Sequence, residues 1–313
     1  MRALLCPASL KGVLSAGDAA AALASGMRTS GAEAIELPTA DGGEGTADAL
    51  HAALGGEWRD AVVADPLGRA VPARWLRLPG DRAVLDAAAA VGLPLLAPAE
   101  RNPLVASSRG LGELVLAALR DGAGALVVGL GGSATVDGGA GMREVLRELP
   151  VPTTVLYDVR TTLADAARLF GPQKGASASD VRVLERRLRE MTELEPYAEL
   201  AGSGAAGGLG AALAALGADL VPGAETVLDL SGFDEHLRGC DLVVTGEGQV
   251  DRTTAEGKAP GVVAARAATA SVRCVVFGGR VVEALEGVET VSLSGDRACA
   301  REDLEALGRR LAQ

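Results

Sequence analysis

Residues 126–141 read LVVGLGGSATVDGGAG, a short apolar run followed directly by a glycine-rich turn. The apolar run predicts a strand buried on both faces, and a helix is expected after it. Open α/β sheets bind ligands at this kind of junction, where glycine amides and the helix dipole favour an anion. A tight turn without a ligand is the alternative interpretation. The candidate ligand groups are Gly131, Gly132, Ser133 and Thr135, with Asp137 for Mg²⁺.

The same alternation of short apolar strands, glycine-rich turns and alanine-rich helices recurs along the chain. It predicts an α/β fold with a parallel sheet covered by helices. The predicted strands are Ala3–Cys6, Ala34–Leu37, Leu126–Leu130, Leu242–Thr245, Cys274–Phe277 and Thr290–Leu293. The predicted helices are Ala16–Thr29, Thr46–Leu54, Gly110–Arg120, Gly139–Leu149 and Gly261–Ala270.

Two stretches do not follow this alternation of strands, turns and helices. Residues 60–105 combine turn signals with two strand-like runs, and residues 150–232 combine a strand with a charged helix and a Gly/Ala-rich helix. We therefore predict a second α/β domain, of residues 60–105 and 150–232, inserted in a first domain. The first domain would comprise residues 1–59, 106–149 and 233–313.

The composition argues against some classes of partner and indicates the kind of core. The 313 residues carry a formal net charge of −11, which argues against nucleic-acid or anionic-membrane partners. Aromatic residues make up only 2%, so Ala, Val and Leu must form the core. The four cysteines are scattered and form no CxxC pair, which favours the reducing cytoplasm.

Two further turns contain features that suit phosphate or metal binding. Gly204, Gly207 and Gly208 open a helix and could bind phosphate, or they could allow close packing of small residues. The turn at residues 40–46, ADGGEGT, offers Asp41 and Glu44 for metal binding or proton abstraction. The alternative for this turn is a solvated loop at the start of a helix.

Lysines accompany the remaining acidic turn. Glu247 and Asp251 follow a predicted strand, and Lys258 comes shortly afterwards, a set that could position Mg²⁺ and phosphate. Lys174 lies in the Gly/Pro turn FGPQKGA at residues 170–176, where it could bind a carboxylate or phosphate. Lys11, beside Gly12, is a weaker candidate. The chain contains no GxxxxGK[ST] phosphate loop.

Taken together, these segments resemble the bacterial glycerate kinase family of glyoxylate and sugar-acid catabolism. The strings DGGEGT at 41–46 and FGPQKGA at 170–176 are the most specific. Other matching segments are Ser9–Gly12, Asp65–Arg69, Arg101–Leu104, Gly110–Leu114, Gly131–Thr135, Gly204–Gly208 and Thr245–Gly248.

The resemblance implies a flavodoxin- or Rossmann-like domain, a second α/β domain and an active site in the cleft between them. It also implies ATP- and Mg²⁺-dependent phosphorylation of glycerate to a phosphoglycerate, with 2-phosphoglycerate favoured. A small-molecule substrate and ATP would be the partners, and the protein would be a monomer or homodimer.

On this hypothesis the glycine-rich loops and Lys258 line the nucleotide side, and Glu44, Asp137 and Glu247 hold Mg²⁺. Either Asp41 or Asp251 accepts the hydroxyl proton. Cations neutralise the substrate carboxylate and the developing phosphate charge. These cations are Lys11, Arg69, Lys174 and Lys258, and Ser9 contacts the substrate with Arg69.

Four positions depart from the family's motifs: Ala8, Val136, Arg160 and Thr253. They leave two alternatives open, a kinase of another small hydroxy acid and a non-catalytic ligand-binding paralogue.

Overall fold

The computed structural model describes all 313 residues, and the chain divides into two compact units. Unit 1 comprises Met1–Asp41, Asp48–Leu54 and Ala224–Gln313. Unit 2 comprises Gly42–Ala47 and Gly55–Gly223. The second unit therefore interrupts the first along the chain.

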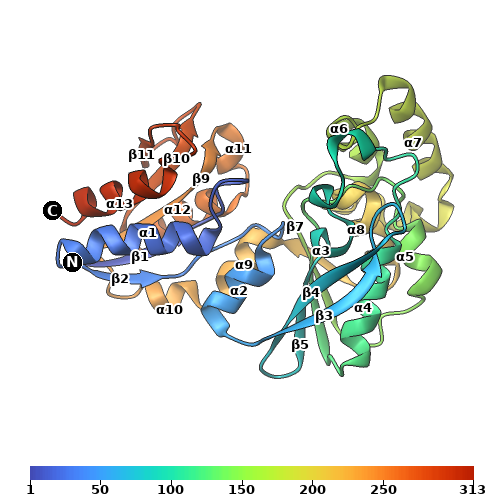
Figure 1. The fold of residues 1–313 in the computed structure, drawn as a ribbon, viewed down its shortest axis with the longest axis horizontal. Coiled ribbons are helices and arrows are strands. Elements are labelled where there is room, and N and C mark those ends of the chain that lie inside the picture. Colours follow the sequence, from blue (N-terminus) through green and yellow to red (C-terminus); the bar gives the residue numbers. More distant parts are fainter. The chain divides into compact units, whose positions relative to one another are not determined.

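Unit 1 is built on a parallel sheet of five strands (Figure 1). The strands are β1 (Arg2–Pro7), β2 (Glu33–Glu36), β9 (Leu242–Val250), β10 (Arg273–Val281) and β11 (Glu289–Ser292). Their order is β2-β1-β9-β10-β11, so that along unit 1 the strands run 2-1-3-4-5. This is the flavodoxin-like order, in which ligands bind where the strand order reverses, here beside β1 and β9.

Helices cover both faces of this sheet because its central strands are apolar on both sides. Ala3 and Leu5 face a core shared with α1 and α13, which lie together in Figure 1, while Leu4 and Cys6 face α10 and α12. The helices that contribute to unit 1 are α1 (Ala16–Thr29), α2 (Thr46–Leu54), α9 (Gly223–Leu230), α10 (Phe233–Leu237), α11 (Arg252–Ala255), α12 (Ala259–Thr269) and α13 (Ala300–Leu311).

Unit 2 contains a mixed sheet of six strands in sequential order. They are β3 (Glu57–Ala64), β4 (Ala70–Leu78), β5 (Arg82–Asp86), β6 (Ala125–Gly129), β7 (Thr153–Tyr157) and β8 (Asp219–Pro222). Strands β3, β4 and β5 pair antiparallel, and β5 to β8 pair parallel. The predicted placement of residues 106–149 in the first domain is therefore wrong, because β6 pairs with β5 and β7.

The helices of unit 2 are α3 (Ala88–Val91), α4 (Arg109–Arg120), α5 (Ala140–Val145), α6 (Ala166–Phe170), α7 (Ala178–Glu190) and α8 (Ala205–Ala215). Helix α5 ends earlier than predicted. Leu146 already has an extended backbone, whereas Pro150 directly disfavours helix only at Leu149.

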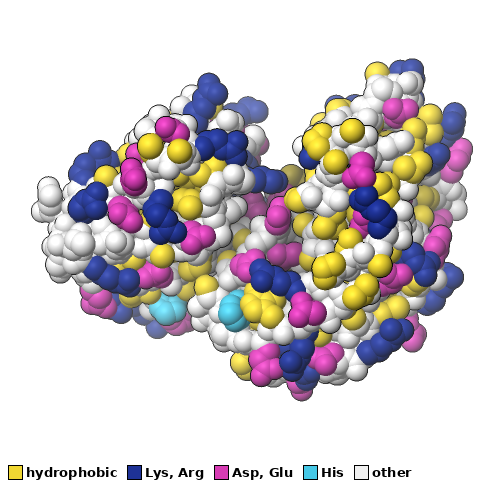
Figure 2. All heavy atoms as spheres, in the orientation of Figure 1, with side chains coloured by type: hydrophobic (Ala, Val, Ile, Leu, Met, Phe, Trp, Pro, Cys, Tyr) yellow, Lys and Arg dark blue, Asp and Glu magenta, His cyan; other side chains and the backbone are white.

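One apolar core holds unit 2 together, and Trp75 of β4 is among its largest fully buried side chains. Trp58 of β3 lies elsewhere on the same hairpin, where the Arg74 guanidinium stacks 4.0 Å from its ring centre. Across the face shown in Figure 2, Lys and Arg side chains are interspersed with Asp and Glu. None of the helices combines the length and apolarity needed to cross a membrane.

Candidate active site

The carboxyl ends of β5, β6 and β7 bring together polar segments that are distant in the sequence. Asp86 ends β5, and its carboxylate accepts hydrogen bonds from Gly45 N (2.9 Å) and Ala47 N (3.2 Å). Asp158 directly follows β7. Neither residue was predicted to belong to the site, because an isolated aspartate at a strand end has no distinctive pattern. Asp86 fixes the loop Gly42–Ala47 at this edge of the sheet.

The loop that contains Glu44 lies against the glycine-rich turn after β6. Gly131 N donates to Gly42 O (3.2 Å), and a Cβ on Gly131 would lie only 2.4 Å from Gly43 Cα. Glu44 Oε2 lies 3.7 Å from where a Cβ on Gly132 would be. Two turns that were predicted separately therefore meet, and Gly131 is needed for their close approach rather than for a free amide.

Lys174 is the buried cation of this site, with 3% of the residue exposed. Its Nζ donates to Ser133 Oγ (3.0 Å) and to Thr135 O (2.8 Å). Burial lowers the pKa of Lys174 to about 7, although the carboxylates of Asp137 and Asp158 oppose this shift. The Thr135 hydroxyl is also buried and has no hydrogen-bond partner. Lys174 thus anchors the turn after β6, where the buried Thr135 hydroxyl keeps an unused donor.

Asp137 is occupied by hydrogen bonds within the protein. Its carboxylate accepts from Ser108 N (2.8 Å), Ser108 Oγ (2.8 Å), Gly141 N (3.1 Å) and Gly139 N (3.1 Å). This arrangement joins the start of α4 to the start of α5. The structure therefore argues against the predicted role of Asp137 as a Mg²⁺ ligand.

The second glycine-rich element supports the first by close packing. Gly204 N donates to Thr161 O, and Gly207 N and Gly208 N donate to Gly204 O. A Cβ on Gly207 would lie 2.1 Å from Thr135 O, at a φ of +71° that disfavours other residues. The packing alternative fits these glycines better than phosphate binding, because their amides already have partners.

Arg69 is neutralised by neighbouring carboxylates. Its Nε lies 2.6 Å from Asp65 Oδ2 and its Nη1 lies 2.7 Å from Glu100 Oε1. A guanidinium with two carboxylate partners has little remaining charge to offer a substrate. This pairing weakens the prediction that Arg69 binds the substrate carboxylate.

In unit 1, Glu247 forms the centre of a polar group on β9. Its carboxylate accepts from Thr254 Oγ1 (2.8 Å) and lies 3.5 Å from Lys258 Nζ. Burial is the main cause that raises the pKa of Glu247, and the charge of Asp41 adds to it, while Thr254 and Lys258 oppose the rise. The predicted residues Asp41, Glu247 and Lys258 therefore belong to one electrostatic group.

Asp251 caps the short helix α11. Its carboxylate accepts from Thr253 N (2.9 Å) and Gln249 Nε2 (2.9 Å), and also from the Thr253 hydroxyl. The hydrogen bond from the Thr253 side chain is the largest cause that lowers the pKa of Asp251 to about 2. Such a carboxylate is a poor proton acceptor near neutral pH.

Ser9 and Lys11 follow β1, next to Glu247 on the neighbouring strand. Pro7 of β1 pairs with Gly246 of β9, and Ala8 N donates to Gly246 O (2.9 Å). Ser9 is partly buried and Lys11 is exposed. These residues lie where the strand order reverses, at the predicted ligand edge of unit 1.

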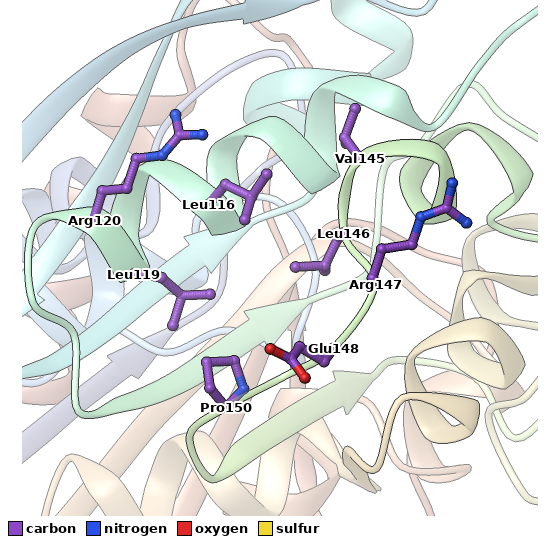
Figure 3. A pocket seen from close by; sticks show the side chains of 8 residues that line it. All are labelled: Leu116, Leu119, Arg120, Val145, Leu146, Arg147, Glu148 and Pro150. Atoms are coloured by element: carbon purple, nitrogen blue, oxygen red, sulfur yellow. The ribbon is translucent and has the colours of Figure 1, made fainter.

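No group of three or more acidic, histidine or cysteine side chains gathers as a metal site. A cavity of about 390 Å³ lies elsewhere, between the end of α4 and the segment after α5 (Figure 3). Its lining residues are Leu116, Leu119, Arg120, Val145, Leu146, Arg147, Glu148 and Pro150, none of which was predicted as a site residue.

Comparisons with known proteins all point to one family. The model of the glycerate kinase family matches residues 3–151 and 144–302. The glycerate 2-kinase of Escherichia coli K12 is 39% identical over 305 residues, covering 83% of this chain and 80% of the relative. The glycerate kinase of Bacillus subtilis 168 is 37% identical over 327 residues, covering 90% and 85%.

A solved structure agrees in fold. The crystal structure described as glycerate kinase 2 of Salmonella typhimurium LT2 has a TM-score of 0.84 and 33% identity, with 100% of this chain and 97% of that chain covered. The chain belongs to the glycerate kinase family and is a kinase.

Proposed function

We propose that this kinase uses ATP and Mg²⁺ to phosphorylate glycerate, with 2-phosphoglycerate as the favoured product. The names of its relatives in E. coli and B. subtilis support glycerate as the acceptor. The observation that carries the proposal is the turn Ser133–Thr135, which the buried Lys174 ammonium anchors at the carboxyl end of β6.

The phosphate-binding role falls to unit 2. Lys174 provides a cation that donates to Ser133 Oγ and to Thr135 O, and the unsatisfied Thr135 hydroxyl lies in the same turn. An anion next to Lys174 favours its protonated form, so we expect its pKa to rise when a phosphate binds. The main task of the protein in phosphoryl transfer is such positioning and charge stabilisation.

The residues of unit 1 fit a magnesium ion although they form no cluster of three. Mg²⁺ commonly takes one or two carboxylates and completes its shell with phosphate oxygens and water. Glu247 is the proposed ligand, because its partly buried charge next to Asp41 is relieved by a divalent cation. When bound, Mg²⁺ would neutralise charge that develops on the phosphate oxygens. Glu44 is the corresponding candidate in unit 2.

Asp41 is the proposed general base. It belongs to the same electrostatic group as Glu247, whereas Asp251 is held as a helix cap with a lowered pKa of about 2. Asp41 would accept the proton of the attacking hydroxyl group. Ser9 and Lys11, after β1, would orient the substrate, and Lys258 would keep Glu247 ionised.

One departure from the family's motifs lies away from the proposed contacts. Val136 is 1% exposed and packs in the core of unit 2, so it replaces no ligand-facing group in this structure. Its burial favours a working kinase over a non-catalytic paralogue. The cytoplasmic location and the monomeric or homodimeric state stay predictions.

A coupled ADP-release assay with D-glycerate, ATP and Mg²⁺ tests the proposal, and ³¹P NMR of the product separates the 2- and 3-phosphates. We expect glycerate-dependent turnover of roughly 1–10³ s⁻¹ that EDTA abolishes. Turnover with another hydroxy acid but not with glycerate would contradict the substrate. Ligand binding without any turnover would contradict the activity.

A further inference from the structure

We propose that Arg101 holds an anionic group of the bound ligand, either the carboxylate of the hydroxy acid or a phosphate of the nucleotide. The identity of that ligand rests on the proposed function. Arg101 is partly buried and forms no ion pair, and its Nε is buried without a hydrogen-bond partner. It lies in unit 2, in the segment that follows Glu100.

This state is unusual among the arginines of the chain. A guanidinium has five donors and no acceptor, and a buried donor without a partner destabilises a fold. Arg59 also has a buried Nε, but its Nη2 lies 2.7 Å from Glu57 Oε2. Arg69 forms ion pairs with two carboxylates, one of which belongs to Glu100, the residue before Arg101. Arg101 keeps its charge unmatched in a protein whose net charge is −11.

The backbone of Arg101 lies directly against the turn that carries Lys174. A Cβ on Gly175 would lie 2.3 Å from Arg101 O and 3.1 Å from Arg101 Cβ, so only glycine allows this approach. The preceding residue, Lys174, binds Ser133 and Thr135. Two buried polar groups without partners, Arg101 Nε and Thr135 Oγ1, therefore occur on segments that both contact the Lys174–Gly175 turn.

The segments on either side of Arg101 are fixed by hydrogen bonds. Asn102 Oδ1 accepts from Leu104 N (3.1 Å), and Arg187 of α7 donates to Leu104 O (2.8 Å). On the other side, Leu93 N donates to Gly132 O (2.9 Å), which ties the preceding segment to the turn after β6. Such a preorganised cation binds an anion without ordering a loop first.

The shape of the Arg101 guanidinium limits which ligand groups it can bind. The planar guanidinium matches the two oxygens of a carboxylate or phosphate in a bidentate contact, which the point charge of lysine cannot reproduce. We therefore expect Arg101, rather than Arg69, to be the arginine that recognises the anionic group in unit 2.

The test measures equilibrium binding by titration calorimetry with Arg101→Gln and Arg101→Lys. The probes are D-glycerate, its uncharged amide glyceramide, and MgATP. We expect both variants to bind one anionic probe roughly 10- to 100-fold more weakly than the wild type. A loss confined to glycerate, with glyceramide unaffected, assigns the carboxylate, and a loss confined to MgATP assigns the phosphate.

Arg187→Gln is the matched control, because it removes an arginine contact to the same segment without touching the proposed site. Thermal unfolding of each variant verifies that it folds. Unchanged affinity of a folded Arg101→Gln for both anions overturns the inference, as does equal weakening in Arg187→Gln. A wild-type protein that binds neither anion also overturns it.

Failure of the proposed function gives a different result. A wild type that binds glycerate and MgATP but transfers no phosphate contradicts the kinase proposal, while the binding data for Arg101 still decide the inference. Conversely, normal turnover of glycerate by Arg101→Gln with unchanged KM values contradicts the inference and leaves the kinase proposal intact.

Discussion

Replacement of Lys174 by methionine should change how stability depends on pH. In the folded protein burial lowers the pKa of Lys174 from 10.5 to about 7. Between these two values the unfolded chain binds a proton that the folded chain does not bind. The free energy of unfolding of the wild type must therefore rise with pH in this window, relative to Lys174→Met, which has no titrating group at this position.

The magnitude follows from the size of the shift. Each pH unit within the window contributes up to roughly 1.4 kcal/mol, so an increase from pH 7.5 to 9.5 should add roughly 2–3 kcal/mol. Because Lys174 is almost completely buried, solvent screening reduces this value little. Taking the difference between two proteins cancels the titration of all other groups.

Urea unfolding followed by circular dichroism at several pH values measures this difference. Lys174→Gln provides a second uncharged replacement of similar size, one that can still donate to Ser133 and Thr135. Both variants should show the same dependence on pH relative to the wild type. A difference that stays constant from pH 7.5 to 9.5 would refute the idea that burial disfavours the charge of Lys174 in the folded state.

Three further changes test the site. Glu247→Gln should lower kcat roughly 10²–10³-fold and raise the Mg²⁺ concentration needed for half-maximal turnover, and a normal Mg²⁺ titration would contradict its proposed role. Asp251→Ala removes a helix cap, so it should cost about 1 kcal/mol of stability, measured as a lower urea midpoint. It should nevertheless reduce turnover less than Asp41→Asn does. A larger loss of turnover in Asp251→Ala than in Asp41→Asn would make Asp251 the base. Gly207→Ala places a Cβ 2.1 Å from Thr135 O, so a loss of at least roughly 1–3 kcal/mol is expected, and an unchanged Tm would show that the close packing is dispensable.

Local signals in the sequence were sufficient for many of the elements. Helix α1 was predicted with its observed bounds, Ala16–Thr29, and the structure shows that Ser15 caps it by accepting from Asp18 N (3.0 Å). Helix α2 was also predicted with its observed bounds, and the strands of unit 1 were found within a few residues. These signals involve residues close together in the chain.

The domain boundaries depended on pairing between distant segments, which no local pattern records. The apolar run that forms β6 resembles the strands of unit 1, and only its pairing with β5 and β7 places it in unit 2. Pro150 was visible in the sequence, but a proline disfavours helix at the residue before it, here Leu149, so it could not have shown that α5 ends at Val145.

In the candidate site, too, local features were predictable from the sequence and contacts between distant residues were not. The sequence identified the turns that matter, but it could not show that Lys174 binds Ser133 and Thr135, about forty positions earlier. It also could not separate a metal ligand from a structural carboxylate. Asp137 and Glu44 are both acidic residues in glycine-rich turns, and only the four hydrogen bonds of Asp137 reveal its structural use.

The scarcity of aromatic residues has a practical consequence for spectroscopy. Both tryptophans, Trp58 and Trp75, and both tyrosines, Tyr157 and Tyr197, lie within Gly55–Gly223 of unit 2. Intrinsic fluorescence therefore reports on unit 2 alone, and the unfolding of unit 1 gives no signal of its own. Circular dichroism reports on the helices of both units, so any separation between the two transitions would reveal a state in which one unit has unfolded before the other.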